Sequence, residues 1–558
     1  MSRPGNTCTA LIAAVALAAC APAAQPPAPP VPAPEHNTVP APAREIVIGV
    51  DRLTGGFNPH TLADLTPVST AIAGLILPSA FRQRPDGQWV LDGTLLTSAE
   101  VTATEPFTVT YRIRHDAQWS NTAPIAAEDF GYLAEQLRTQ PGVVDSAGYQ
   151  LIDQVASRDG GKTAEVVFRR PYPAWRTLFR QLLPAHLIKD APGGWSSALD
   201  GGFGVSGGPF VLISFDPTRG ELLLGRNDRY WDTPAQVDRI LFREAGDAAV
   251  VDALRTGGAQ AALFGHPDAI TESLLKESGG PHTVSVVPQP IVASVLLRPA
   301  STVLDDERVR IAVAAALDRP GLIATGAASG PSAALRADSQ VFAPSQPAYR
   351  PSAPAEGIPV RSNPETTQRL LSEAGYDRGP DGWERAGNPL RLVVAAPADR
   401  EPYGVLATRV AAMLRSAGIQ AELRLVPAEE LLGTRGPDTV EADIAVLSHP
   451  VAGDPGTQLA SWYGCPLVVP ARLAPAPPNP AGLCDLSLQP LIEQALIADD
   501  PAGVLAARVE AGLWEQVVTV PLYQQTWLLV TTPALEGVIP GSPLAGPLDG
   551  AQRWRLRL

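Results

Sequence analysis

The sequence predicts an α/β protein with at least two lobes. At 558 residues the chain is too long for one compact core, because cores stop growing at about 250–300 residues. Its hydrophobic content of 45% and mean hydropathy of +0.03 are typical of a soluble folded chain. Short strand-like segments alternate with amphipathic helix-like segments, which favours parallel strands covered by helices.

The N-terminus predicts a lipoprotein signal peptide at residues 1–20. Arg3 supplies a positive start, and residues 9–19 are an unbroken run of small and apolar side chains, too short to span a bilayer. The run ends in Leu-Ala-Ala-Cys20, which resembles a bacterial lipobox, so we expect Cys20 to be acylated. A plain signal peptide, in which Cys20 has no role, is the alternative. Acyl chains on Cys20 would anchor the protein, since each buried methylene contributes about 0.8 kcal/mol.

Residues 21–43 predict a tether. The segment is rich in proline and alanine, and proline at this density favours a stiff, extended chain that cannot pack into a core. At about 3 Å per residue it would hold the folded body several nanometres from the membrane.

The folded body begins with strand-like segments. Each is short, rich in branched or aromatic residues, and bounded by turn formers. The expected strands cover residues 45–50, 107–113, 164–168, 210–215, 221–224 and 239–242.

The middle of the chain predicts helices. Asn363 provides an N-cap, followed by Pro364 in the first turn, and Gly375 ends the helix. A second helix covers residues 405–417, and a third covers 309–317.

The second helix lies between two strand-like segments. Residues 390–395 precede it and residues 419–426 follow it. A strand-helix-strand unit implies two parallel strands. Two proline-rich stretches, at 343–359 and 466–480, predict surface loops.

The charge argues against two classes of partner. The net charge of −14 opposes nucleic-acid binding, which needs clustered cations, and adhesion of the folded body to anionic lipid. The seven histidines include no close pair and no HExxH motif, so we expect no metal site and no cofactor. The paired acids Asp305-Asp306 and Asp499-Asp500 stand beside helix starts, which favours a capping role.

Two motif matches have the wrong context. Residues 204–208 match the nucleophile elbow of hydrolases at Ser206, but glycines precede the serine and Pro209 with a strand follows it. The same glycines match a dinucleotide fingerprint that lacks the required helix. The sequence therefore predicts no catalytic residue.

Several segments together resemble the family 5 extracellular solute-binding proteins, the class that contains the peptide and nickel receptors of ABC importers. The resemblance implies a two-lobed fold of the periplasmic-binding-protein type (type II, peptide-binding class), with mixed sheets and a ligand cleft between the lobes. The matching segments are WSNTAPIAAEDF (119–130), GGPF (207–210), RNDRYW (226–231), VRIAVAAALDR (309–319), LLSEAGY (370–376) and the segment 411–418.

A narrower resemblance is to LpqW-type lipoproteins of mycobacteria. The segments that carry it are 56–82, 139–152, 184–194, Tyr463-Gly464-Cys465-Pro466 and Gly482-Leu483-Cys484-Asp485. That type is implicated in the assembly of phosphatidylinositol mannosides and lipoarabinomannan.

One departure bears on the ligand. Peptide receptors of the family carry an acid that pairs with the α-ammonium of the peptide, in a segment like A-D-Y-x-D-P. This chain has Val451 in the corresponding place and keeps Asp454-Pro455. An ammonium buried without a counter-charge is costly by several kcal/mol, so free peptide N-termini should bind poorly unless Asp454 substitutes. A shift of the alignment by three residues would restore an acid.

The resemblance also implies the division into lobes. Lobe one would comprise 44–290 and 520–558, with a subdomain at about 81–204, and lobe two would comprise 291–519. We expect a disulfide between Cys465 and Cys484, with free thiols as the alternative.

Four residues are candidates for binding the ligand. Trp119, Trp462 and Tyr463 adjoin the matching segments and would stack on sugar or apolar groups, although each equally suits a core. Asp454 is the fourth.

The sequence thus predicts a non-catalytic lipoprotein, anchored at the outer face of the plasma membrane, that holds a glycolipid intermediate between its lobes. The alternative is a receptor that delivers peptides or another solute to an ABC importer. The expected partners are the ligand, the membrane through the anchor, and an importer permease or an envelope-assembly membrane protein.

Overall fold

The computed structural model describes residues 44–557, apart from 54–55, 434–439, 452, 468–469, 471–472, 474–476, 478 and 501–502. Cys20 and the predicted tether lie outside the described residues. A ten-stranded mixed sheet runs through the described part in the order β17-β16-β18-β12-β19-β11-β1-β10-β9-β8. Its strands are β1 (Glu45–Val50), β8 (Phe210–Asp216), β9 (Glu221–Arg226), β10 (Arg239–Glu244), β11 (Ala261–Phe264), β12 (Thr283–Leu297), β16 (Arg391–Pro397), β17 (Gln420–Val426), β18 (Ile444–Pro450) and β19 (Thr519–Thr531).

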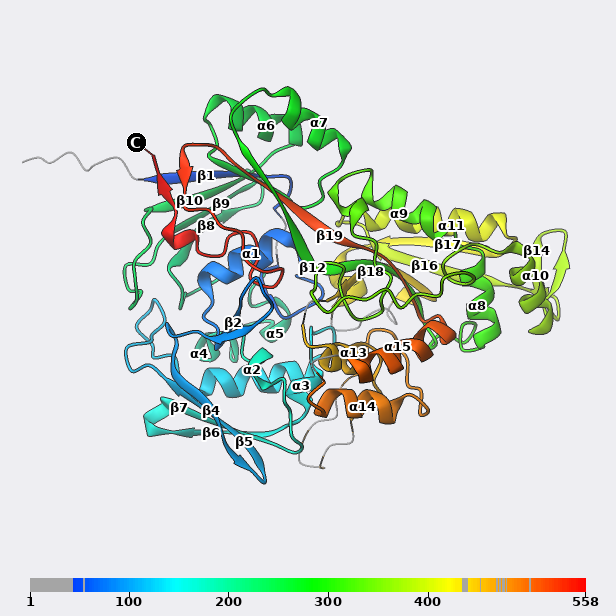
Figure 1. The fold of residues 1–558 in the computed structure, drawn as a ribbon, viewed down its shortest axis with the longest axis horizontal. Coiled ribbons are helices and arrows are strands. Elements are labelled where there is room, and N and C mark those ends of the chain that lie inside the picture. Colours follow the sequence, from blue (N-terminus) through cyan, green and yellow to red (C-terminus); the bar gives the residue numbers. More distant parts are fainter. Residues whose placement is uncertain are drawn as a thin grey trace, which may run out of the picture. The chain divides into compact units, whose positions relative to one another are not determined.

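The two longest strands connect the two halves of this sheet (Figure 1). β12 and β19 pair antiparallel along their length, with β11 beside one end and β18 beside the other. Their register shifts between Pro288 and Val292, so Gln525 of β19 has no partner in the ladder there. Proline cannot donate to a ladder, and Pro288 borders this break while Pro290 lies within it. The predicted two-lobed α/β fold is confirmed, and β12 and β19 form its connection.

Lobe one is built on β1 and β8–β11. Helix α1 (Pro67–Ile76) packs beneath these strands, and its N-cap Thr66 accepts a hydrogen bond from the Ser69 amide. An antiparallel sheet in the order β4-β5-β7-β6 forms a further layer, against which α2 (Ala127–Thr139) packs. One hydrophobic core joins these layers. The strands of the smaller sheet are β4 (Leu96–Thr104), β5 (Phe107–Ile113), β6 (Ile152–Arg158) and β7 (Thr163–Phe168).

Lobe two has helices on both faces of β16, β17 and β18. β16 and β17 are parallel, in register from Arg391↔Gln420 to Pro397↔Val426, and α11 (Tyr403–Ser416) joins them. This confirms the predicted strand-helix-strand unit. One face is covered by α8 (Glu307–Ala315), α9 (Arg319–Ala327), α10 (Pro364–Glu373) and α11, and the other by α13 (Pro455–Tyr463), α14 (Gln489–Ile497) and α15 (Val504–Gln516).

Shorter elements complete the two lobes. Figure 1 shows α6 and α7 at the edge of lobe one. The remaining elements are β2 (Phe81–Gln83), β3 (Trp89–Leu91), α3 (Ala147–Gln150), η1 (Asp159–Gly161), η2 (Trp175–Thr177), α4 (Ala185–Ile188), α5 (Gly194–Ser197), α6 (Asp247–Thr256), α7 (Ala269–Glu277), η3 (Pro331–Ala334), β13 (Asp377–Gly379), β14 (Gly382–Arg385), β15 (Asn388–Pro389), α12 (Ala428–Leu432), β20 (Leu535–Glu536), η5 (Ala551–Arg553) and β21 (Arg555–Leu556).

The predicted capping residues act as expected. Asn363 accepts from the Thr366 amide at the start of α10, and Asp306 accepts from the Arg308 amide at the start of α8. Asp500 accepts from the amides of Val504 and Leu505 at the start of α15. Ser206 is fully buried, and its hydroxyl donates to the Phe210 carbonyl, so this serine supports a loop.

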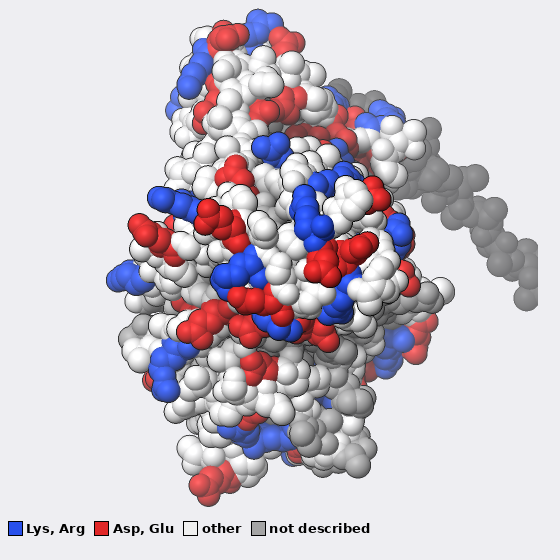
Figure 2. Space-filling model, turned by 90° about the vertical axis from the view of Figure 1, so that its right-hand side faces the viewer, with Lys and Arg blue, Asp and Glu red and all other residues white. Residues whose placement is uncertain are grey.

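The charged residues are dispersed over the surface. Figure 2 shows acidic and basic side chains interspersed over the face at the end of lobe two that carries α8, α10 and α11. Many of them pair, as in Arg391–Glu422 at 2.7 Å and Arg424–Glu422 at 2.8 Å. No helix among the described residues is both long and apolar enough to cross a membrane.

Candidate ligand cavity between the lobes

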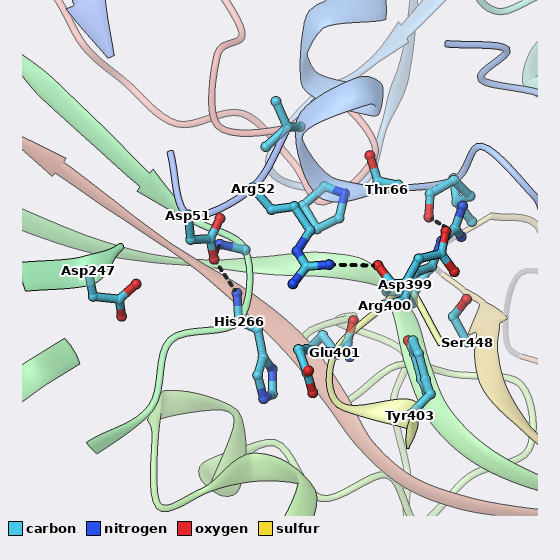
Figure 3. Close-up of a pocket in the computed structure, with 16 residues that line it drawn as sticks. Asp51, Arg52, Thr66, Asp247, His266, Asp399, Arg400, Glu401, Tyr403 and Ser448 are labelled. Atoms are coloured by element: carbon cyan, nitrogen blue, oxygen red, sulfur yellow. Dashed lines mark hydrogen bonds between the residues drawn. The ribbon is translucent and has the colours of Figure 1, made fainter. Parts of the chain in front are cut away.

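A cavity of about 250 Å³ lies where β12 and β19 lose their register (Figure 3). Ile291 of β12 and Gln525 of β19 line it at this break. Lobe one contributes residues that follow β1 and β11 and the start of α1, and lobe two contributes the loop after β16 and the end of β18. The polar side chains of the lining are Asp51, Arg52, Thr66, Asp247 and His266 from lobe one and Asp399, Arg400, Glu401, Tyr403 and Ser448 from lobe two.

Asp51 is a partly buried acid in the lobe-one wall. It follows β1 directly, and its Oδ2 accepts hydrogen bonds from the amides of Gly265 at 2.7 Å and His266 at 3.3 Å. Burial raises the pKa of Asp51 to about 6, and the nearby charge of Asp247 adds to this rise, while the two amides oppose it. The carboxyl group therefore fixes the loop after β11 and titrates near neutral pH.

Two arginines bridge the lobes beside the cavity in opposite directions. Arg52 of lobe one donates through Nη1 to the Asp399 carbonyl at 3.1 Å. Arg400 of lobe two donates through Nη1 to the carbonyls of Leu62 at 3.1 Å and Leu65 at 3.2 Å. Each arginine thus holds the main chain of the opposite lobe, which stabilises the closed arrangement.

Three buried polar atoms of the lining have no hydrogen-bond partner of normal geometry among the described residues. They are Nε of Arg400, the hydroxyl of Tyr403 and Nε2 of Gln525. Burial raises the pKa of Tyr403 to about 12, so the hydroxyl keeps its proton at neutral pH. The side chains of Ser448 and Gln525 lie close enough to Tyr403 to interact with its hydroxyl, but without good hydrogen-bond geometry. Poorly satisfied buried polar groups are rare in folded proteins, and a bound ligand would offer these three atoms better partners.

The lining is mixed, because Leu65, Pro67, Val68 and Ile291 give it more apolar than polar surface, and it favours a ligand of modest size with both apolar and polar faces. Four carboxylates (Asp51, Asp247, Asp399 and Glu401) face two arginines, so the cavity combines acceptors with the free donors and does not favour a strongly anionic group. Its volume equals about eight waters at ~30 Å³ each, enough for one sugar ring or a short peptide unit.

Comparison with protein families identifies the architecture. Residues 91–467 match the family described as "Bacterial extracellular solute-binding proteins, family 5 Middle", which is more than half of the chain. The chain belongs to this family. The predicted family is therefore confirmed, and the cavity lies between the two lobes of a family 5 protein.

The family 5 relatives include a full-length match. The chain is 36% identical to "Probable monoacyl phosphatidylinositol tetramannoside-binding protein LpqW" of Mycobacterium tuberculosis, with 97% of this chain and 96% of the relative covered. "Oligopeptide-binding protein OppA" of Mycobacterium bovis is 30% identical over 56% of this chain and 53% of its own length. This chain is thus an LpqW-like member of family 5.

Solved structures of family 5 proteins share the fold. The Bacillus subtilis oligopeptide-binding protein AppA, in complex with a nonapeptide, has a TM-score of 0.73 at 14% identity and covers 93% of this chain and 100% of its own. The periplasmic EDTA-binding protein EppA has a TM-score of 0.71 at 22% identity, with 92% and 96% covered.

None of the four predicted ligand residues lines the cavity between the lobes. Trp119 is fully buried in the core of lobe one, where its indole N–H donates to Asp129 Oδ2 at 3.3 Å. Tyr463 is buried in lobe two, and its hydroxyl donates to Gln340 and lies 2.9 Å from the Thr519 hydroxyl oxygen. Trp462 stacks on His449 with ring centroids 4.4 Å apart. These aromatic side chains serve the packing of the closed form.

Asp454 and Val451 occupy different environments. Asp454 caps α13 by accepting from the amide and hydroxyl of Thr457, both at 2.8 Å, and burial raises its pKa. Val451 is buried in an apolar cluster with Val292, Ala337 and Ala343. No acid stands at the Val451 position, and Asp454 is already engaged by the helix that it begins.

The late cysteines are joined. Cys465 and Cys484 form a disulfide with Cα atoms 4.6 Å apart, in the loop region between α13 and α14.

The residues that line the cavity were missed from the sequence, although one signal was available. Asp51 and Arg52 follow β1, and Asp399 and Arg400 follow β16, so both pairs stand at carboxyl ends of strands. In α/β sheets with parallel strands, ligands bind at those ends. Asp247, His266 and Gln525 carry no comparable signal, because only the fold brings them to the cavity.

Proposed function

We propose that this protein is a non-catalytic receptor for a mannosylated glycolipid headgroup, which it binds in the cavity between its lobes. The observation that carries the proposal is the cavity lining, where carboxylate acceptors stand beside the unsatisfied donors of Arg400, Tyr403 and Gln525. Sugar hydroxyls donate and accept at once, so they match such a lining. The LpqW relative, whose name specifies a tetramannoside, supports the ligand class.

The membrane anchor belongs to the same proposal. Acylated Cys20 would hold the protein at the outer face of the plasma membrane, and the tether of residues 21–43 would let it reach lipid headgroups. Its membrane partner would be an envelope-assembly protein that receives or senses the glycolipid.

The ligand would close the lobes by a hinge motion. We place the hinge at the register break of β12 and β19, close to the boundary at residues 290–291 that the sequence predicts. Because Gln525 and Ile291 stand at this break and line the cavity, a ligand that contacts them would stabilise the closed form directly.

A receptor that delivers oligopeptides to an ABC importer is the second candidate. It is supported by the OppA relatives and by the nonapeptide complex of AppA. The apolar surroundings of Val451 weigh against it, because an ammonium buried there would have no counter-charge.

Thermal unfolding with the two ligand classes separates these candidates. Monoacyl phosphatidylinositol tetramannoside should raise Tm, since a ligand that binds only the folded state stabilises it. Tripeptides to pentapeptides should leave Tm unchanged. The opposite pattern would refute the glycolipid proposal and support the peptide receptor. Native mass spectrometry of protein from its own host would identify a co-purified ligand.

A further inference from the structure

Away from the cavity, the lobes touch each other directly. The Ala147 amide of lobe one donates to Ser461 Oγ of lobe two at 3.0 Å, and the hydroxyls of Tyr172 and Thr457 lie 2.7 Å apart. The interlobe spaces beside these contacts measure only about 10 and 20 Å³. Each has room for at most about one water, so protein atoms fill this part of the cleft.

An aromatic pair contributes much of this filling. The rings of His449 and Trp462 stack at an interplanar angle of 11°, and both side chains are buried. They share the smaller of the two spaces with Leu62 and Val143 of lobe one. A ligand could enter here only if both rings moved.

Asp145 reaches from lobe one towards the start of α13. It holds a left-handed backbone conformation with φ of 53°, which is unfavourable for a residue other than glycine. Its Oδ2 lies 3.4 Å from the position that a Cβ on Gly453 would take. The carboxyl group therefore lies in van der Waals reach of the main chain just before the Asp454 cap.

These contacts adjoin two larger spaces. Along the end of β18, Ser448 lines the cavity, His449 and Pro450 line the 10 Å³ space, and Gly453 with Asp454 lines an open groove of about 710 Å³. Neighbouring residues of β18 thus border the cavity and the contact region, and Arg400 of the cavity donates to the carbonyl of Leu62, which lines the 10 Å³ space. The contact region therefore adjoins the cavity.

We propose that Asp145, Tyr172, His449 and Trp462 form an interlobe plug that sets the length of the ligand portion held between the lobes. The inference rests on the proposed function and deepens it. The plug confines the bound part to the 250 Å³ cavity, which takes about one sugar ring. The remainder of the ligand leaves past Arg52 and Glu401, whose side chains are exposed at the cavity.

The plug can be tested without any ligand. The double variant Asp145→Gly/Tyr172→Phe removes the carboxylate and the cross-lobe hydrogen bond, and glycine suits the left-handed conformation, so the chain should still fold. Hydrogen exchange should become about tenfold faster in residues 143–150 and 455–463. The matched control Asp159→Gly/Tyr132→Phe replaces another left-handed aspartate and a tyrosine outside the plug, and should leave these segments unchanged. Unchanged exchange in the plug variant would overturn the proposal.

The length limit is tested by calorimetry with methyl α-mannoside and linear mannosides of two to five units. In the natural protein, Kd should stop improving once one or two rings are present, whereas in the plug variant the longer mannosides should gain about tenfold. A steady gain up to five units in the natural protein would overturn the plug. If no mannoside binds either protein, the glycolipid function fails, and the exchange result alone decides the plug.

Discussion

At the scale of single residues, Val451 separates two ligand classes. It is buried among apolar side chains, and the sequence resemblance predicts that peptide receptors of the family carry an acid in the corresponding place. Replacing Val451 with Asp should therefore improve the binding of tripeptides by about tenfold or more, since a paired ammonium gains several kcal/mol over an unpaired one. Calorimetry would measure the change, with Val405→Asp on the exposed side of α11 as control. No gain would show that the ammonium site lies elsewhere.

Asp51 makes a second residue-scale prediction, on pH. Its pKa of about 6 in the folded state exceeds the ordinary value of 3.8, so the folded state binds more protons between these values. Stability contributed by Asp51 is thus present below about pH 4 and lost as the pH rises through 6. Asp51→Asn should raise the free energy of unfolding at pH 7.5 by on the order of 1–3 kcal/mol relative to the natural protein.

The advantage of Asp51→Asn should shrink as the pH falls through 6 towards 4, because the carboxyl group of the folded state then takes up its proton. Urea unfolding of both proteins across this range measures the difference. A constant difference would contradict the raised pKa.

At the scale of elements, the disulfide stabilises the segment between α13 and α14. Closing a loop with a sequence separation of 19 residues restricts the unfolded chain and is worth about 3 kcal/mol by the loop-entropy estimate. Cys465→Ser/Cys484→Ser should lower the free energy of unfolding by about that amount. Reductant should destabilise the natural protein and leave the variant unaffected. Equal unfolding midpoints for the two oxidised proteins would contradict this contribution.

Local elements were predictable where neighbouring residues decide them. The cap at Asn363 and the β16-α11-β17 unit follow from side chains within a few positions of each other. β12, β18 and β19 were not predicted. Twelve of the thirteen residues of β19 are buried, so the strand lacks the alternation of polar and apolar residues that marks a half-exposed strand.

At the scale of the whole molecule, the arginines beside the cavity favour the closed form. Arg400 donates to two carbonyls of lobe one, and hydrogen bonds from charged groups are worth about 1.5–3 kcal/mol each. Arg400→Gln should therefore increase the radius of gyration of the ligand-free protein in small-angle scattering and weaken ligand binding by about tenfold. The exposed Arg409 on α11 offers a control, since Arg409→Gln should change neither quantity. A variant as closed as the natural protein would show that other contacts hold the lobes.

The candidate site depended on long-range contacts. Its lining comes from residues as far apart as Asp51 and Gln525, with no common motif. Aromatic residues beside the family segments suggested a ligand role, but Trp119 and Tyr463 pack into cores because large apolar side chains are stabilised most by full burial.

By itself, the sequence determined the α/β class, the helix caps, the paired strands around α11 and the family, because local spacing and ordered motifs carry that information. Only the tertiary structure decided where the cavity lies, which donors remain unsatisfied in it, and which residues of the two lobes contact each other away from it. These features arise where segments hundreds of residues apart come together, and burial and hydrogen bonding at such places depend on the partner segment as much as on the residue itself.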